Sequence, residues 1–181
     1  MISGGGKQKG GNFERLICKK LSLWVSYGKR DDIFWRSAMS GGRATVGLKK
    51  GIKRTNQFGD ITAIDPMGQK LIDTFIIECK AYKNIQLQSM LFGKPKDNSI
   101  YGFWLKLHEQ ATLLCKDKML IIRPNNLSIL ICLDKDSCFR QILRDTYDIK
   151  PLAVFSNIEP ICYLYEFTHV LNLVDPADIT K

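Results

Sequence analysis

The sequence has few histidines and no closely paired cysteines, which argues against a structural zinc site. It contains two histidines, His108 and His169, and six cysteines that stand singly, mostly within apolar runs. Structural zinc sites instead use ligands in closely spaced pairs such as CxxC. The pattern is typical of buried free thiols, and it leaves the two histidines to packing or surface roles.

The sequence also lacks any apolar run of the length that a membrane-spanning helix needs. Residues 1–11 are rich in glycine and lysine and contain no apolar core segment, so they are predicted to form a flexible basic arm. We therefore expect a cytoplasmic protein without membrane association. The length suits one substantial core, and residues 12–181 are expected to form a single domain without internal repeats.

A relative shortage of acidic residues gives the chain a strong positive charge. Lysine and arginine number 27 against 18 aspartates and glutamates, a formal net charge of +9, and the basic residues are spread along the chain. This distribution favours a polyanionic partner such as nucleic acid. Because many basic proteins have no such partner, the charge alone does not establish one.

Apolar patterns of both helical and strand period indicate an α/β chain. Helical spacing predicts a first helix over residues 12–25, with Asn12 as its N-cap and Glu14 in its first turn. Residues 33–39 are expected to form a strand that leads into a glycine turn, and residues 44–58 an exposed loop. The later pattern predicts helices and core strands in this order: a helix over 101–116, strands over 119–122 and 128–133, a helix over 137–147, and at least one strand or short helix within 152–174.

The middle of the chain is expected to form a β-hairpin. Its pattern indicates a strand over residues 58–65, a turn over residues 66–69 and a longer strand over residues 70–81. Such a hairpin would place Asp60, near the start of the first strand, opposite the region of Glu78 in the second.

Two acidic-x-lysine triplets occur, and their surroundings distinguish them. Asp148-Ile149-Lys150 follows a polar helix end, whereas Glu78-Cys79-Lys80 closes the apolar run 75–77 and is expected to lie on a buried strand. Side chains alternate along a strand, so Glu78 and Lys80 share one face. Burying a carboxylate and an ammonium there is costly unless they pair or bind a ligand.

Asp60 and Glu78, converging at an open face, would make an oxygen-rich site that suits Mg²⁺. The ion would stabilise charge that develops on a phosphate and lower the pKa of a bound water, which Lys80 would orient or deprotonate. Glu14 is a further candidate ligand, although acidic residues in the first turn of a helix also occur because they stabilise its dipole. The alternative for the other three residues is an ordinary salt bridge on an exposed sheet face.

Three features together resemble the PD-(D/E)xK nuclease superfamily: Gly59-Asp60, the Glu78-Cys79-Lys80 triplet at the end of an apolar strand, and a preceding helix that bears Glu14. The resemblance covers residues 12 to about 133, with Gly59 at the position usually occupied by proline. It implies an α/β fold with a restriction-endonuclease-like core, a mixed central β-sheet flanked by helices. It also implies Lys80 as the catalytic lysine, Mg²⁺ or Mn²⁺ as cofactor, and a shared set of metal ligands: Asp60, Glu78, the backbone carbonyl of Cys79, and Glu14.

Within the superfamily, the N-terminal part is most similar to Holliday-junction resolvases, which open with a basic arm, a glutamate-bearing helix and a strand ending in a serine-glycine turn. A glycine turn beside arginines can cradle phosphate through its N–H groups, and a basic loop contacts DNA if it faces the cleft. The alternatives are plain turn chemistry and a solvated loop. The candidate DNA contacts lie in this turn and loop: Arg36, Ser40, Gly41, Gly42, Arg43, Lys49, Lys50, Lys53 and Arg54. Gln110 lies on the helix after the catalytic strand, where many superfamily members place a polar residue facing the site.

The sequence therefore favours a metal-dependent DNA endonuclease that acts on branched or junction DNA, in recombination or repair. A homodimer is expected, because cutting two strands favours two-fold symmetry. Three alternatives stay open: a sequence-specific restriction or homing-type endonuclease of a phage or mobile element, a non-catalytic DNA-binding module, and a role without nucleic acid.

Overall fold

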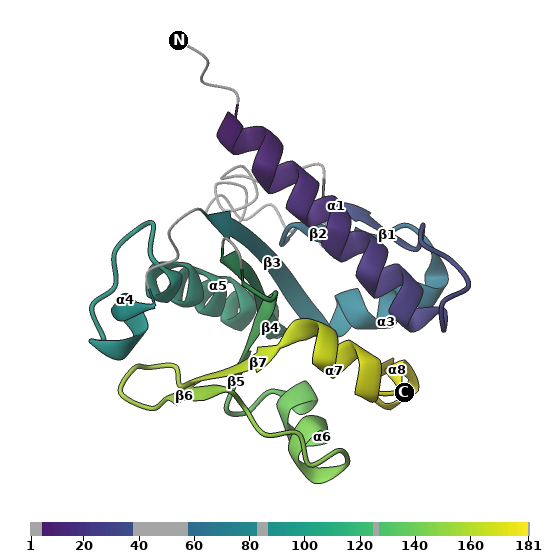
Figure 1. Cartoon of the computed structure of the whole chain (residues 1–181). Coiled ribbons are helices and arrows are strands. Elements are labelled where there is room, and N and C mark those ends of the chain that lie inside the picture. Colours follow the sequence, from purple (N-terminus) through teal and green to yellow (C-terminus); the bar gives the residue numbers. More distant parts are fainter. Residues whose placement is uncertain (1–4, 38–57, 83–86, 125–126, 181) are drawn as a thin grey trace.

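The computed structural model describes residues 5–37, 58–82, 87–124 and 127–180, which form a sheet with helices on both faces (Figure 1). Five strands pair in the order β3-β4-β5-β7-β6. Their bounds are Phe75–Tyr82 (β3), Asp117–Pro124 (β4), Leu130–Asp134 (β5), Ala153–Phe155 (β6) and Cys162–Glu166 (β7). β3 and β4 run parallel and the other neighbours antiparallel, so the sheet is mixed, as predicted.

Two hydrophobic cores lie on opposite faces of this sheet. One is covered by helices α1 (Gly5–Val25), α3 (Pro66–Thr74), α6 (Cys138–Asp145), α7 (Phe167–Leu173) and α8 (Pro176–Thr180). The other is covered by α5 (Ile100–Leu114) and the short α4 (Gln88–Leu91). Along β3, Ile76 joins the α5 side whereas Ile77 and Cys79 join the α1 side. This alternation is the one predicted for the strand that carries Glu78 and Lys80.

The first helix is longer than the sequence pattern predicts. α1 begins at Gly5 rather than after Asn12, so residues 5–11 are helical where a flexible arm is expected. Asn12 is therefore not an N-cap, and its Oδ1 accepts a hydrogen bond of 3.0 Å from Arg15. Glu14 lies beyond the first turn, so its interpretation as a first-turn carboxylate that stabilises the helix dipole is wrong. Glycine has a low helix propensity, and the buried apolar stripe of α1 starts only at Phe13, so residues 5–11 extend a helix that packs further along the chain.

The hairpin predicted over residues 58–81 is also wrong. A short strand, β2 (Ile61–Ala63), pairs antiparallel with β1 (Phe34–Arg36) rather than forming a hairpin with β3. The residues predicted as a turn and as the beginning of the second strand form helix α3. The longer strand, β3, starts only at Phe75.

Local capping explains why a helix replaces the turn. Asp65 is the N-cap of α3, its side chain accepts a hydrogen bond of 2.9 Å from the N–H of Met67, and Pro66 opens the helix. Gly68, which favours a turn in the sequence, has a packing role instead. A Cβ at this position would lie 2.7 Å from the ring of Phe34, so only glycine lets α3 approach β1 this closely.

The second half of the chain follows the prediction more closely. α5 matches the helix predicted over residues 101–116, and β4 and β5 lie where two core strands are predicted and pair antiparallel. The C-terminal segment supplies two strands and packs back on the first helix, where the indole N–H of Trp24 donates to the carbonyl of Val174 at 2.9 Å. Four of the six free cysteines are buried, whereas Cys115 and Cys138 are exposed. No helix in the described ranges is both long and apolar enough to cross a membrane.

Candidate active site

Three charged side chains converge near the end of β3. The ammonium of Lys80 is ion-paired with Glu78 and lies 3.5 Å from Oδ2 of Asp60. All three side chains are largely covered, with exposed fractions of 8% for Asp60, 23% for Glu78 and 21% for Lys80. The ammonium also lies 5.6 Å from the ring centroid of Phe103 on α5. The structure therefore brings together the three residues that sequence analysis selects.

Asp60 reaches this position through its backbone. Its N–H donates to the carbonyl of Ile77 at 2.8 Å, and its carbonyl accepts from the N–H of Ser37 at 2.9 Å. Its Oδ2 accepts from the N–H of Cys79 at 2.8 Å. The approach of Asp60 to Glu78 is thus as predicted, although no hairpin produces it.

Gly59 makes this close approach possible. Its φ is +80°, and a Cβ at this position would lie 2.7 Å from the carbonyl oxygen of Ile77. Proline cannot adopt this φ, so the departure from the usual superfamily pattern has a local structural reason. Sequence analysis treats Gly59 only as a variation and misses this role. A glycine directly before a candidate acidic ligand is the signal that points to it.

The charges in the site strongly affect one another. Burial, together with the negative charge of Asp60, raises the pKa of Glu78 to about 7, and the ion pair with Lys80 opposes this rise. Burial lowers the pKa of Lys80, but the charges of Glu78 and Asp60 outweigh burial and raise it above its ordinary value. The site therefore favours an additional positive charge near its carboxylates.

The second acidic-x-lysine triplet has a different environment. Asp148 and Lys150 are ion-paired in solvent, with side-chain exposed fractions of 79% and 77%. Asp148 also has a positive φ of 50°. The prediction that the Glu78-Cys79-Lys80 triplet lies on a buried strand is confirmed.

Glu14 and Arg36 form a second charged pair, between α1 and β1. The Nε of Arg36 donates to Oε2 of Glu14 at 2.5 Å, and the two side chains have exposed fractions of 29% and 12%. The guanidinium lies so close to α1 that a Cβ on Gly11 would be 3.1 Å from its Nη1. The charge of Glu14 also raises the pKa of Glu78, with a smaller effect than burial, Asp60 or Lys80. The proposed roles of Glu14 in metal binding and of Arg36 in DNA binding stay predictions.

Several predicted contacts cannot be placed. The remaining candidate DNA contacts lie outside the described residues: Ser40, Gly41, Gly42, Arg43, Lys49, Lys50, Lys53 and Arg54. Gln110 is half-buried on α5, two helical turns after Phe103, and its role in the site stays a prediction. The carbonyl of Cys79 as a metal ligand likewise stays a prediction.

The donor set fits a hard divalent cation. Within the described ranges, no group of three or more histidine, cysteine, aspartate or glutamate side chains is arranged to hold a metal ion. Asp60 and Glu78 nevertheless supply two carboxylates within reach of one ammonium. Mg²⁺ commonly binds one or two protein carboxylates and completes its coordination with water and substrate phosphate. Two oxygen donors are therefore sufficient for Mg²⁺ and poorly suited to zinc.

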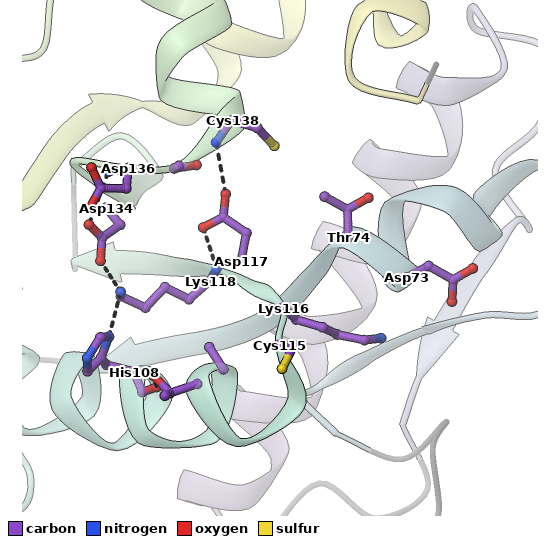
Figure 2. Close-up of a pocket in the computed structure, with 13 residues that line it drawn as sticks. Asp73, Thr74, His108, Cys115, Lys116, Asp117, Lys118, Asp134, Asp136 and Cys138 are labelled. Atoms are coloured by element: carbon purple, nitrogen blue, oxygen red, sulfur yellow. Dashed lines mark hydrogen bonds and ion pairs between the residues drawn. The ribbon is translucent and has the colours of Figure 1, made fainter.

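A separate pocket of about 530 Å³ lies around the start of β3 and β4 (Figure 2), whereas Lys80 lies near the other end of β3. Buried Lys118 is ion-paired there with Asp134, and its Nζ lies 2.9 Å from Nδ1 of His108 and 4.7 Å from the ring centroid of Trp104. Burial and the charge of Lys118 lower the pKa of His108. These charged groups satisfy one another, which agrees with a packing role for His108.

The fold and this site together define the class of the protein. A mixed sheet between helices, with a glutamate and a lysine on β3 and an aspartate that contacts them, fits the PD-(D/E)xK nuclease fold. A family model described as "phage putative PDDEXK endonuclease" matches residues 5–179, and the chain belongs to this family. Comparisons with curated proteins and with solved structures found no match. The predicted superfamily is confirmed, whereas the closer similarity to Holliday-junction resolvases stays a prediction.

Proposed function

We propose that the chain hydrolyses DNA phosphodiester bonds as a metal-dependent endonuclease, with Asp60, Glu78 and Lys80 in its active site. The observation that carries this proposal is the meeting of two carboxylates and one ammonium in a largely covered position. Two neighbouring carboxylates repel each other in such a position unless a cation compensates them. Membership of an endonuclease family supports the same chemistry.

Asp60 and Glu78 would hold the divalent ion, with the carbonyl of Cys79 as a further oxygen donor. Mg²⁺ suits these ligands, and Mn²⁺ would substitute for it. The bound ion would supply positive charge where negative charge develops on the phosphate. Glu14 is the candidate for an additional ligand, and its ion pair with Arg36 would keep its carboxylate oriented.

Lys80 would position the attacking water. Its ammonium contacts both carboxylates that would hold the ion, so it would donate a hydrogen bond to a water bound beside them. An ammonium donates hydrogen bonds and accepts none. We therefore favour orientation of the water by Lys80 over its deprotonation by Lys80. The ring of Phe103 covers the same ammonium and limits its movement.

We propose branched or junction DNA as the preferred substrate and a homodimer as the active assembly. The net charge of +9 supports a polyanionic substrate. A two-fold assembly would place one active site on each of two strands. A sequence-specific endonuclease of the same fold is the alternative, and it differs by cutting linear duplex at one site.

The test is cleavage of four matched DNA substrates: a four-way junction, a flap, a linear duplex and a supercoiled plasmid. Each is incubated with the wild-type protein, Lys80→Ala or Asp60→Asn, in Mg²⁺, Mn²⁺ or EDTA. Lys150→Ala is the matched control, because Lys150 belongs to the exposed triplet. We expect metal-dependent cutting by the wild type and the control, and none by the other two variants.

Each contrary result has a distinct meaning. Cutting by Lys80→Ala at the wild-type rate would contradict the proposed active site. Binding of DNA without cutting of any substrate would indicate a non-catalytic binding module. Equal cutting of all four substrates would contradict the preference for branched DNA.

A further inference from the structure

Of the three tryptophans in the chain, Trp35 differs from the others in its environment. Trp24 and Trp104 are buried, and their indole N–H groups donate to the carbonyls of Val174 and Pro160. Trp35 lies on β1 with 55% of its surface exposed. A single exposed apolar side chain needs no special explanation, so its significance depends on what lies beside it.

The neighbours of Trp35 on β1 show which way it points. Arg36 contacts Glu14 on α1, and Phe34 is buried in the core on the α1 side of the sheet. Side chains alternate along a strand, so Trp35 points away from α1. In the β1-β2 ladder, Trp35 is paired with Thr62.

The pairing of β1 with β2 brings Trp35 close to Asp60. The ladder covers β1 and β2 only, and directly beyond it the N–H of Ser37 donates to the carbonyl of Asp60 at 2.9 Å. Asp60 precedes Thr62 by two positions, and Ile61 between them is buried on the α1 side. Asp60 therefore lies two residues from the strand partner of Trp35, directly before the strand that pairs with β1.

Ile64 extends this exposed surface. It follows β2, is 62% exposed, and lies two positions after Thr62, on the side away from Asp60. Trp35 thus stands between a candidate metal ligand and a second exposed apolar side chain. Apolar side chains beside a nucleic-acid site can hold base steps apart, and aromatic side chains stack on unpaired bases regardless of sequence.

We propose that Trp35 stacks on an unpaired base of the bound DNA, beside the phosphate that is cut. The inference rests on the proposed function and narrows its substrate class to DNA with unstacked bases at the cut position. In an intact duplex both faces of each base are covered by its neighbours. Trp35 would therefore act as a specificity-determining residue that favours branch points over continuous duplex.

The experiment measures DNA affinity of the full chain in EDTA, so that no cleavage occurs. The probes are a four-way junction and a linear duplex of the same sequence, each with 2-aminopurine at the branch position or its equivalent. The variants are Trp35→Ala and Trp35→Phe. Tyr27→Ala is the matched control, because Tyr27 is an exposed aromatic residue beyond the far end of α1.

We expect Trp35→Ala to weaken junction binding about tenfold and to leave duplex binding unchanged. Trp35→Phe should retain most of the affinity, and Tyr27→Ala should behave as the wild type. Junction DNA should protect the wild-type tryptophan emission from iodide, because Trp35 is the exposed emitter. The 2-aminopurine emission should fall on binding to the wild type but not to Trp35→Ala.

An equal loss of affinity for the junction and the duplex in Trp35→Ala would overturn the inference. Iodide quenching of the wild type that junction DNA does not change would overturn it as well. A change in sedimentation of Trp35→Ala without a change in DNA affinity would overturn it too, by assigning Trp35 to a subunit contact. Because the measurement uses no metal, it is independent of cleavage. Loss of cutting specificity in the substrate panel can therefore be distinguished from loss of base stacking in the binding experiment. Absence of all DNA binding by the wild type would overturn both the proposed function and the role of Trp35.

Discussion

The backbone N–H of Cys79 donates a hydrogen bond of 2.8 Å to the Asp60 carboxylate. Cys79, the middle residue of the triplet, thus holds the proposed metal ligand Asp60 in place. Its neighbours on β3 are the second proposed ligand, Glu78, and Lys80. Because the donor is a backbone group, substitutions of the Cys79 side chain cannot remove this bond. The geometry of the site therefore depends on how closely the backbone before β2 approaches β3.

Gly59→Ala tests this dependence. Alanine would be strained at φ +80°, and its Cβ would clash with the carbonyl of Ile77. We expect displacement of Asp60, a fall in cleavage of about a hundredfold, and a loss of about 1–3 kcal/mol in the free energy of unfolding. Cleavage rates and urea denaturation measure the two effects.

Gly28→Ala is the control for that substitution, since Gly28 has φ +81° but no atom within 4 Å of its added Cβ. The Gly28→Ala variant introduces the backbone strain without the clash. It should lower the free energy of unfolding by about 1 kcal/mol and leave the cleavage rate unchanged. If the two glycine variants cut DNA equally well, the close approach at Gly59 does not position the site.

An exchange of charges between Glu14 and Arg36 tests whether Glu14 has a role beyond its ion pair. Glu14→Gln and Arg36→Gln should each cost about 1–3 kcal/mol of stability, because each removes a charged hydrogen bond from a partly buried pair. The double variant Glu14→Arg/Arg36→Glu should recover part of that stability. It should not recover Mg²⁺-dependent cleavage if Glu14 is a metal ligand. Recovery of both stability and cleavage would show that Glu14 acts only through its ion pair with Arg36.

The buried pair Lys118 and Asp134 should be important for stability. Asp134→Ala leaves the ammonium without its carboxylate, and we expect a loss of about 3–5 kcal/mol in urea denaturation. The double variant Lys118→Met/Asp134→Leu removes both charges and should recover most of the loss. Asp148→Ala, in the exposed pair, should change little. A similar small effect of Asp134→Ala would contradict the structural role of the buried pair.

His108 should give the protein a component of pH-dependent stability. Burial and the nearby charge of Lys118 lower its pKa, and these outweigh the opposite influences of Asp134 on β5 and Glu109 on α5. The folded state therefore disfavours protonated His108. The contribution is fully present above the ordinary histidine pKa of 6.5 and is lost as the pH falls through the lowered value in the folded protein.

The measurement is the midpoint of urea denaturation between about pH 7.5 and pH 5.5, compared between the wild type and His108→Gln. The wild type should lose more stability than the variant on acidification. Parallel curves would show that His108 titrates as it does in the unfolded chain.

The sequence predicts the chemistry of the site better than the path of the backbone through it. Strand alternation correctly places Glu78 and Lys80 on one face, because the period of a strand depends only on local geometry. The region between Asp60 and Glu78 is predicted incorrectly, because Pro66 and Gly68 are read as turn residues. Asp65-Pro66 is in fact a helix start, and Gly68 is a packing position against Phe34.

The start of α1 could not be predicted for a related reason. Its first residues are glycines and lysines, which favour a flexible segment when considered alone. Neither the Glu14–Arg36 pair nor the approach of Gly11 to Arg36 is visible in local sequence, since each depends on contacts between α1 and β1. Tertiary contacts of this kind have no periodic signal.

The hydrogen bond from Trp24 to the carbonyl of Val174 has a consequence for how the protein is made. It joins positions separated by 150 residues, and Val174 and Ile179 belong to the same core as α1. During synthesis the ribosome releases α1 long before residues 174–179, so the part of its apolar face that they cover stays exposed until nearly the whole chain has been made. Folding that depends on such distant contacts is slow, and apolar surface that stays exposed in the meantime is prone to aggregation.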